Sequence, residues 1–193
     1  MDAEPEAGPV SAEPVLSDSV SFEPVVRAVG PADRAELVRL ADRALEHLDT
    51  QKGGEVYRHR EARPRPVDAT VDADLAAAAD GRAIVLLGCL GPAAVGYAVA
   101  RVELTRSAPL AVVEDLYVEP EARGVGVGRR LMDELVERAE AAGCGGIQAE
   151  ALPGDRATKN FFEGFGLVAR KITVHRPLGA TEDDLGDDVD RGA

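Results

Sequence analysis

The chain has 193 residues, enough for one domain with a full hydrophobic core and too few for two domains of ordinary size. Its formal net charge is −13, but residues 1–24 hold six acidic and no basic side chains, and residues 177–193 hold six acidic side chains and one basic side chain. The part between them is close to neutral, which argues against a nucleic-acid-binding face.

Both ends of the chain are expected to be disordered, because they are acidic, poor in large apolar residues and biased in composition. The N-terminal arm, residues 1–21, is rich in proline, and the C-terminal tail, residues 179–193, is rich in aspartate and glycine. We therefore assign one folded domain to residues 22–178.

Within this domain, strand and helix patterns alternate. The predicted elements are, in chain order, a strand at 25–29, a helix at 31–48, a polar loop at 49–66, a helix at 70–79, a strand hairpin at 83–90 and 94–105, a strand at 110–118, a glycine-rich loop at 123–128, a helix to 142 that ends at Gly143, a strand at 147–152, a helix at 155–164 and a last extended segment at 167–175. This order predicts an α/β domain with a mixed sheet flanked by helices.

Residues 83–100 form an uncharged run that is near the lower length limit of a membrane span. Gly91 and Pro92 stand at its centre and favour a turn between two buried strands, so no membrane association is expected. Cys89 and Cys144 have neither metal-ligand nor disulfide spacing, and the three histidines are scattered. No metal site is therefore expected, and a reducing, cytoplasmic location fits because the N-terminus lacks the features of a signal peptide.

The most informative segment is the glycine-rich loop between the strand at 110–118 and the next helix. Gly124, Gly126 and Gly128 alternate with valines, which lets the backbone turn tightly and direct N–H groups one way. The following helix adds the free N–H groups and partial positive charge of its N-terminus. This construction suits a pyrophosphate, although a bare structural turn is an open alternative. The pattern is neither a P-loop nor a GxGxxG dinucleotide fingerprint.

Arg129 and Arg130 stand in the first turn of that helix, where each opposes the helix dipole by roughly 0.3–1 kcal/mol. A bound anion would reverse this cost. Ion pairs with Asp133 and Glu134 at helical spacing are the alternative explanation, and the two are compatible.

Residues 123–128, Arg-Gly-Val-Gly-Val-Gly, resemble the R/Q-x-x-G-x-G/A motif of the GNAT superfamily of acetyltransferases. Residues 116–120, Leu-Tyr-Val-Glu-Pro, look like the end of that family's fourth strand. Residues 159–167, Lys-Asn-Phe-Phe-Glu-Gly-Phe-Gly-Leu, resemble its closing helix, commonly FYxxxGF. The resemblance covers about residues 22–178 and implies a mostly antiparallel, twisted sheet that splays between its fourth and fifth strands.

In that family acetyl-coenzyme A lies in the opening of the sheet. The resemblance implies that the backbone of Leu116 and Val118 pairs with the pantetheine arm. It places the pyrophosphate on the backbone amides of the loop and the first helical turn, which are those of Arg123, Gly124, Val125, Gly126, Val127, Gly128 and Arg129. Phe162 would pack against the thioester.

The sequence Glu-Asp-Leu-Tyr-Val at 114–118 is similar to that around the base of polyamine acetyltransferases in the superfamily. Glu114 is therefore the candidate base that takes a proton from the acceptor amine. The alternative is an exposed strand residue or an ion-pair partner. Asp115 is expected to be a structural or partner-facing acid.

Two positions depart from the family pattern. Phe162 replaces a tyrosine that often serves as general acid, and Asp155 stands where an asparagine often contacts the cofactor. The leading hypothesis is an N-acetyltransferase acting on a primary amine of a small molecule. The alternatives are a protein N-terminal or lysine acetyltransferase, and a non-catalytic acyl-CoA-binding sensor, which Phe162 keeps open. The sequence does not fix the oligomeric state, and a homodimer is one option.

Overall fold

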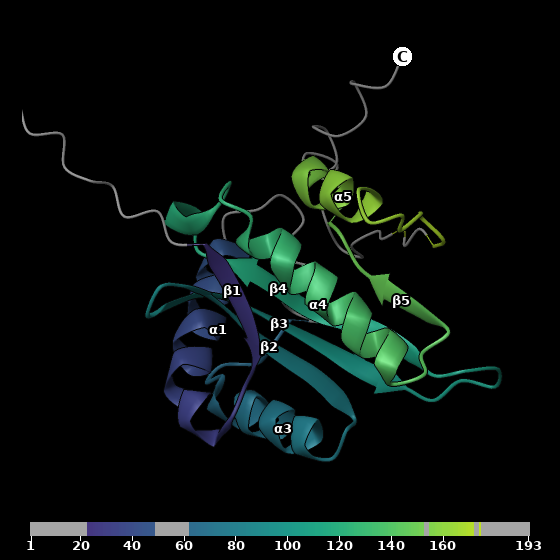
Figure 1. The fold of residues 1–193 in the computed structure, drawn as a ribbon, viewed down its shortest axis with the longest axis horizontal. Helices are drawn as coiled ribbons and strands as arrows, with labels where there is room; N and C mark the ends of the chain where they lie inside the picture. Colours follow the sequence, from purple (N-terminus) through teal and green to yellow (C-terminus); the bar gives the residue numbers. More distant parts are fainter. Residues whose placement is uncertain (1–22, 49–61, 153–154, 172–173, 175–193) are drawn as a thin grey trace, which may run out of the picture.

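The computed structural model describes residues 23–48, 62–152, 155–171 and 174 (Figure 1). Its elements are, in chain order, β1 (Pro24–Ala28), a 3-10 turn (Pro31–Asp33), α1 (Arg34–Leu48), α3 (Asp68–Ala79), β2 (Ala83–Leu90), β3 (Ala93–Glu103), β4 (Leu110–Val118), a second 3-10 turn (Pro120–Ala122), α4 (Val127–Ala141), β5 (Gly146–Ala149) and α5 (Arg156–Glu163).

The five strands form one sheet in the order β1-β2-β3-β4-β5. The first three pairings are antiparallel, whereas β4 and β5 are parallel. The uncharged run at 83–100 forms the β2–β3 hairpin, with Gly91 in the left-handed region at its turn (φ 56°). The described residues contain no helix that has both the length and the apolar character needed to cross a membrane.

Helices cover both faces of the sheet and divide the core into two layers (Figure 1). On one face, α1 and α3 pack against the side chains of Val85, Tyr97 and Val99. On the other face, α4 and α5 pack against Leu86 and Ala98. Alternate residues of β2 and β3 therefore face opposite layers, and these two strands are buried on both sides.

Most predicted elements are present with small shifts in their ends. The helix expected at 31–48 opens with a 3-10 turn, and the strand expected at 147–152 is shorter and ends at Ala149. Gly143 has φ 75° and ends α4 as expected, with the Cys144 N–H bonded to the carbonyl of Ala139.

The prediction of a last strand at 167–175 is wrong for the residues that can be checked. Residues 167–171 and 174 carry no strand, and the remainder lies outside the described residues. Helix α5 ends in a C-terminal cap, in which the Leu167 N–H bonds to the carbonyl of Phe162 and Gly166 adopts φ 77°. The predicted disordered ends, 1–21 and 179–193, also lie outside the described residues.

Helix α4 approaches the sheet closely because glycines lie beneath its first turns. A Cβ atom on Gly88 would stand 2.7 Å from Val127, and one on Gly96 would stand 2.7 Å from the backbone oxygen of Tyr117 and 3.4 Å from Leu131. Because these two residues have no side chains, the start of α4 lies directly on the sheet. The position of the helix in turn sets that of the loop before it.

The Gly96→Ala variant is expected to lower the free energy of unfolding by roughly 1–3 kcal/mol, because its new methyl group would meet a backbone atom that cannot move aside. Gly30→Ala is the matched control, since the nearest atom to its Cβ would be 3.9 Å away. Denaturant unfolding of both variants provides the measurement. Equal stability of Gly96→Ala and the wild-type protein would contradict the tight contact between Gly96 and the backbone of β4.

Candidate active site

The sheet opens between β4 and β5. The two strands pair only from Leu110 with Gly146 to Val113 with Ala149, and β5 ends there. Residues 115–118 of β4 continue to pair with β3 but have no partner strand on their other side among the described residues. The predicted splay between the fourth and fifth strands is present at this point.

A β-bulge stands where the sheet opens. Asp115 pairs with Val99 and Val113 pairs with Ala100, so Glu114 is an extra residue with no partner on β3. The extra residue reverses the alternation of the strand. Val113 faces the α4 layer, whereas Tyr117, four residues later, faces the α1 and α3 layer.

The same reversal places the two β4 residues expected to bind the pantetheine arm. The side chains of Leu116 and Val118 are half-buried against the α4 layer. Their backbone lies on the free edge of β4, but the carbonyl of Val118 accepts a hydrogen bond from the Arg123 side chain (Nε–O 3.0 Å). The Arg123 side chain therefore occupies one of the two lone pairs of this oxygen.

The glycine-rich loop has the backbone geometry of an anion-binding nest. Gly124 and Gly126 adopt φ 81° and 96°, and Gly126 caps the N-terminus of α4. The first helical hydrogen bond runs from the Arg130 N–H to the Gly126 carbonyl (3.0 Å). In the described part of the chain, the backbone N–H groups from Gly124 to Arg129 have no acceptor, so they are available to an anion.

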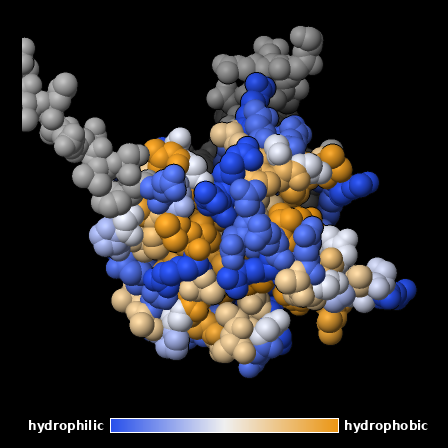
Figure 2. Space-filling view, viewed as in Figure 1, coloured by the Kyte–Doolittle hydropathy of each residue, from blue (hydrophilic) through white to orange (hydrophobic). Residues whose placement is uncertain are grey.

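Arginines surround this loop. The ion pairs considered for Arg129 and Arg130 with Asp133 and Glu134 do not form among the described residues; Glu134 instead pairs with Arg138 at 2.7 Å. The Arg129 guanidinium lies 5.1 Å from the centre of the Phe165 ring. Figure 2 shows the hydrophilic outer surface of α4, where acidic and basic side chains are mixed.

Helix α5 closes the site beside the loop. Phe161 lies 3.7 Å from the Cβ position of Gly128 and contacts both Phe162 and Phe165. Phe162 itself is only 8% exposed and packs in the α4 layer of the core. Asp155 caps α5, accepting hydrogen bonds from the Thr158 N–H (2.9 Å) and hydroxyl (2.6 Å). Although burial of this carboxyl opposes the change, these bonds lower the pKa of Asp155.

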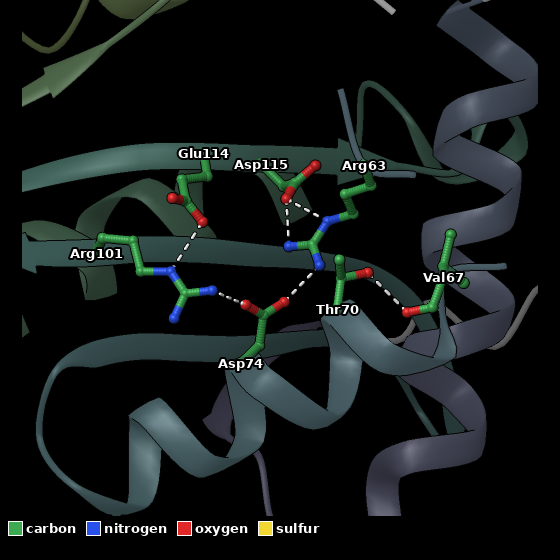
Figure 3. Close-up of polar contacts among 7 residues, drawn as sticks. All are labelled: Arg63, Val67, Thr70, Asp74, Arg101, Glu114 and Asp115. Atoms are coloured by element: carbon green, nitrogen blue, oxygen red, sulfur yellow. Dashed lines mark hydrogen bonds and ion pairs between the residues drawn. The ribbon is translucent and has the colours of Figure 1, made fainter. Parts of the chain in front are cut away.

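A chain of five charged side chains runs along the α3 side of the bulge (Figure 3). Glu114 accepts a hydrogen bond from Arg101 Nε (3.0 Å), and Arg101 also contacts Asp74 on α3. Asp74 in turn accepts from Arg63 (2.5 Å), which donates to Asp115 at 2.7 and 2.5 Å. The Asp74 side chain is 3% exposed and the Arg63 side chain is 10% exposed, so the centre of the network is buried.

Burial and charge act in opposite directions within this network. Burial alone would lower the pKa of Arg63, but the neighbouring carboxylates, Asp115 first, raise the pKa of its guanidinium overall. Arg63 therefore stays charged. Burial and the Asp115 carboxylate raise the pKa of the Tyr97 hydroxyl well above its usual value, so this group stays protonated.

Sequence reasoning singled out Glu114, whose role as the base stays a prediction, and its ion pair with Arg101 matches the alternative role of an ion-pair partner. It missed the network to which this pair belongs. One signal was present: Asp74 stands three residues after Val71 and three before Ala77, and both of these are buried on α3. An aspartate on the buried stripe of a short helix indicates a charged partner inside the fold. Arg63 and Arg101 could not be named as those partners, because they come from separate segments.

The described residues contain no group of three or more histidine, cysteine, aspartate or glutamate side chains that would suit a metal ion. The groups that the described residues bring to the opening include the network carboxylates, the edge of β4 and the N–H groups of the loop.

A family model described as the acetyltransferase (GNAT) family matches residues 41–167, more than half of the chain. The chain therefore belongs to the GNAT family and is an acetyltransferase, as the sequence motifs indicated. The family uses acetyl-coenzyme A, and the unpaired N–H groups and αL glycines of the loop fit its pyrophosphate. No curated protein matches the sequence.

Solved structures share the fold at low sequence identity. A transcriptional regulator from Bacillus halodurans C-125 is 21% identical, with a TM-score of 0.61 over 81% of this chain and 100% of that one. AAC(6')-Iy, in complex with the bisubstrate analogue CoA-S-monomethyl-acetylneamine, is 15% identical, with a TM-score of 0.61 over 81% and 99%. The ribosomal-protein-alanine N-acetyltransferase from Brucella melitensis biovar Abortus 2308 is 18% identical, with a TM-score of 0.59 over 81% and 99%.

The Gly126→Val variant is expected to weaken acetyl-coenzyme A binding by about 10²–10³-fold, because a β-branched residue at φ 96° would turn the loop N–H groups away from the pyrophosphate. Gly143→Val is the matched control: it introduces the same kind of strain at φ 75° at the other end of α4. Calorimetric titration measures both. Unchanged affinity of Gly126→Val, or an equal loss in Gly143→Val, would refute the assignment of the loop.

Proposed function

We propose that this acetyltransferase moves the acetyl group of acetyl-coenzyme A to a primary amine of a small molecule, with Glu114 as the base. The observation that carries the proposal is the position of Glu114 on the bulge, where β4 parts from β5. The side chain is 43% exposed, so an acceptor can reach it.

An alkylamine with a pKa near 10.4 is about 3.4 units away from its neutral form at pH 7, a deficit of roughly 4.6 kcal/mol. Glu114 bonds to Arg101 through Oε2, and its Oε1 has no partner among the described residues (Figure 3). This free oxygen accepts a proton from the ammonium, directly or through water. The neutral amine then attacks the thioester carbonyl, the new C–N bond forms, the C–S bond breaks and coenzyme A leaves as thiolate. The nitrogen gives up its second proton to the departing thiolate or to solvent, which leaves the neutral amide.

The free edge of β4 and the loop support the donor side of the proposal. The backbone of Leu116 and Val118 pairs with the pantetheine arm as an added strand would. The amides from Arg123 to Arg129 bind the pyrophosphate, and the basic side chains of Arg123, Arg129 and Arg130 add charge beside it.

The proposal does not require a tyrosine acid. Phe162 offers no hydroxyl and its ring is buried in the α4 layer. A thiol with a pKa near 8.5 is close to its ionised form at working pH, so the thiolate leaves without a dedicated proton donor. The role of Phe162 in this scheme is apolar packing beside the thioester, which keeps water out.

The Glu114→Gln variant is expected to lower turnover by roughly 10²–10⁴-fold near neutral pH and to retain acetyl-coenzyme A affinity, because the amide cannot take up the proton. Glu103→Gln, an exposed site at the end of β3, is the control and should behave as the wild-type protein does. Release of free thiol is measured across a panel of diamines, aminoglycosides and peptides with free N-termini or lysines.

The panel also separates the candidate acceptors. Turnover restricted to the peptides would replace the small-molecule acceptor with a protein N-terminus or lysine. If the wild-type protein binds acetyl-coenzyme A but releases no thiol with any acceptor, the proposal is contradicted. The protein would then be a non-catalytic acyl-CoA-binding sensor. An active Glu114→Gln variant with an unchanged pH–rate profile would remove Glu114 from the mechanism.

A further inference from the structure

Asp74 is the most deeply buried charged group among the described residues, and stability does not explain it. Removing an ion from water costs several kcal/mol even after the protein relaxes, and buried ion networks often stabilise a protein no more than apolar residues of similar volume do. Its helix, α3, is rich in alanine at neighbouring positions, so an apolar side chain would suit the buried stripe. The charge therefore calls for another explanation.

The connections of Asp74 supply one. Its two carboxylate oxygens contact two different guanidiniums, Oδ1 that of Arg101 and Oδ2 that of Arg63. Each guanidinium reaches onward to a different residue of the bulge, Arg101 to Glu114 and Arg63 to Asp115. Figure 3 shows Asp74 midway between the two arms, below the strand that carries the bulge.

We propose that Asp74 is a positioning residue of the acetyltransferase site, which acts through Arg63 and Arg101 to hold the carboxylates of Glu114 and Asp115 in place on the bulge. The proposal rests on the assignment of Glu114 as the base. A bulge frees its extra residue from the ladder, so the direction of Glu114 has to be fixed by side-chain contacts. The planar fork of Arg101 suits this, because it bonds to two carboxylates at once.

The network also fixes the charge around Glu114. Three carboxylates and two guanidiniums give one net negative charge. The groups that face the bulge are Arg101 and Tyr97 from β3, Asp74 from α3 and Arg63 from the segment before α3. If Asp74 loses its negative charge, less of the positive charge of the two guanidiniums is neutralised. The ionised form of Glu114 is then favoured. Removal of the positive charge of Arg101 has the opposite effect.

The test therefore uses two variants that move the same titration in opposite directions. In Asp74→Asn, Glu114 should protonate at lower pH than in the wild-type protein. Arg101→Gln should act in the opposite direction, since an adjacent cation is lost. The readout is the ¹³C signal of the Glu114 side-chain carboxyl as pH is varied, assigned by its loss in Glu114→Gln and recorded without acceptor.

Asp72→Asn is the matched control. Asp72 lies on the same helix but is exposed and pairs with Arg34, so its loss should leave the Glu114 titration unchanged. Opposite shifts in the two variants support the proposal. An unchanged titration in both, or shifts in the same direction, would overturn it and leave Asp74 with a structural role only.

Turnover separates this proposal from the proposed function. With an active acceptor, the acid limb of the pH–rate profile should move as the carboxyl titration does. If the titrations shift but no acceptor is acetylated, the link to Glu114 stands and the proposed function fails.

If Asp74→Asn does not fold, Arg101→Lys tests the same link, because an ammonium keeps the charge but cannot bridge both carboxylates in a fork. Its turnover should fall by about 10-fold or more with acetyl-coenzyme A affinity unchanged. Wild-type turnover in this variant would overturn the proposal.

Discussion

One extra residue in β4 decides what each later residue of that strand can do. Side chains alternate along a strand with a period of two, so a single insertion moves every following residue to the other face. Before Glu114 the strand contributes Val113 to the α4 layer; after it, Tyr117 joins the opposite layer and Leu116 packs against the α4 layer. The bulge, the end of pairing with β5 and the charged network all meet within three residues.

Glycine serves this site in two unrelated ways. Gly88 and Gly96 have no room for a side chain, and this lets the first turn of α4 lie directly on the sheet. Gly124 and Gly126 have ample room but adopt a backbone conformation that other residues avoid. The first pair sets where the helix begins, and the second pair sets which way the amides before it point. Together they aim the positive end of the helix dipole at the mouth of the opening.

The parts of the structure that depend on local sequence were predictable. The apolar periods of 2 and 3.6 located nearly every element. The spacing of the glycines indicated the loop before α4, and Gly143 indicated where that helix ends. The bulge was not predicted, because Glu114 differs from a regular strand residue only in its pairing with β3. The final strand was wrong for the described residues because a short run of alternating apolar residues does not by itself supply a strand to pair with, and residues 168–171 lie exposed after the cap of α5.

Long-range charge pairing was the other limit. Asp72 and Asp74 look alike in the sequence, yet one is exposed and bonds to α1 while the other is buried between two arginines. The helical period separates them, but their partners lie on other elements. Arg63 comes from a segment whose sequence showed only that it was polar, and its bond to Asp115 spans 52 positions of the chain. Such contacts depend on the finished packing of α3 against the sheet.

The edge of β4 that has no partner strand among the described residues also exposes the protein to unwanted pairing with another chain. A strand with open N–H and C=O groups is a template on which another chain can pair, and proteins protect such edges with charged side chains. Arg123 provides that protection here, because its side chain bonds to the Val118 carbonyl and places a positive charge beside the opening. One side chain beside the glycine-rich loop thus covers part of the strand edge that another chain could otherwise use for pairing.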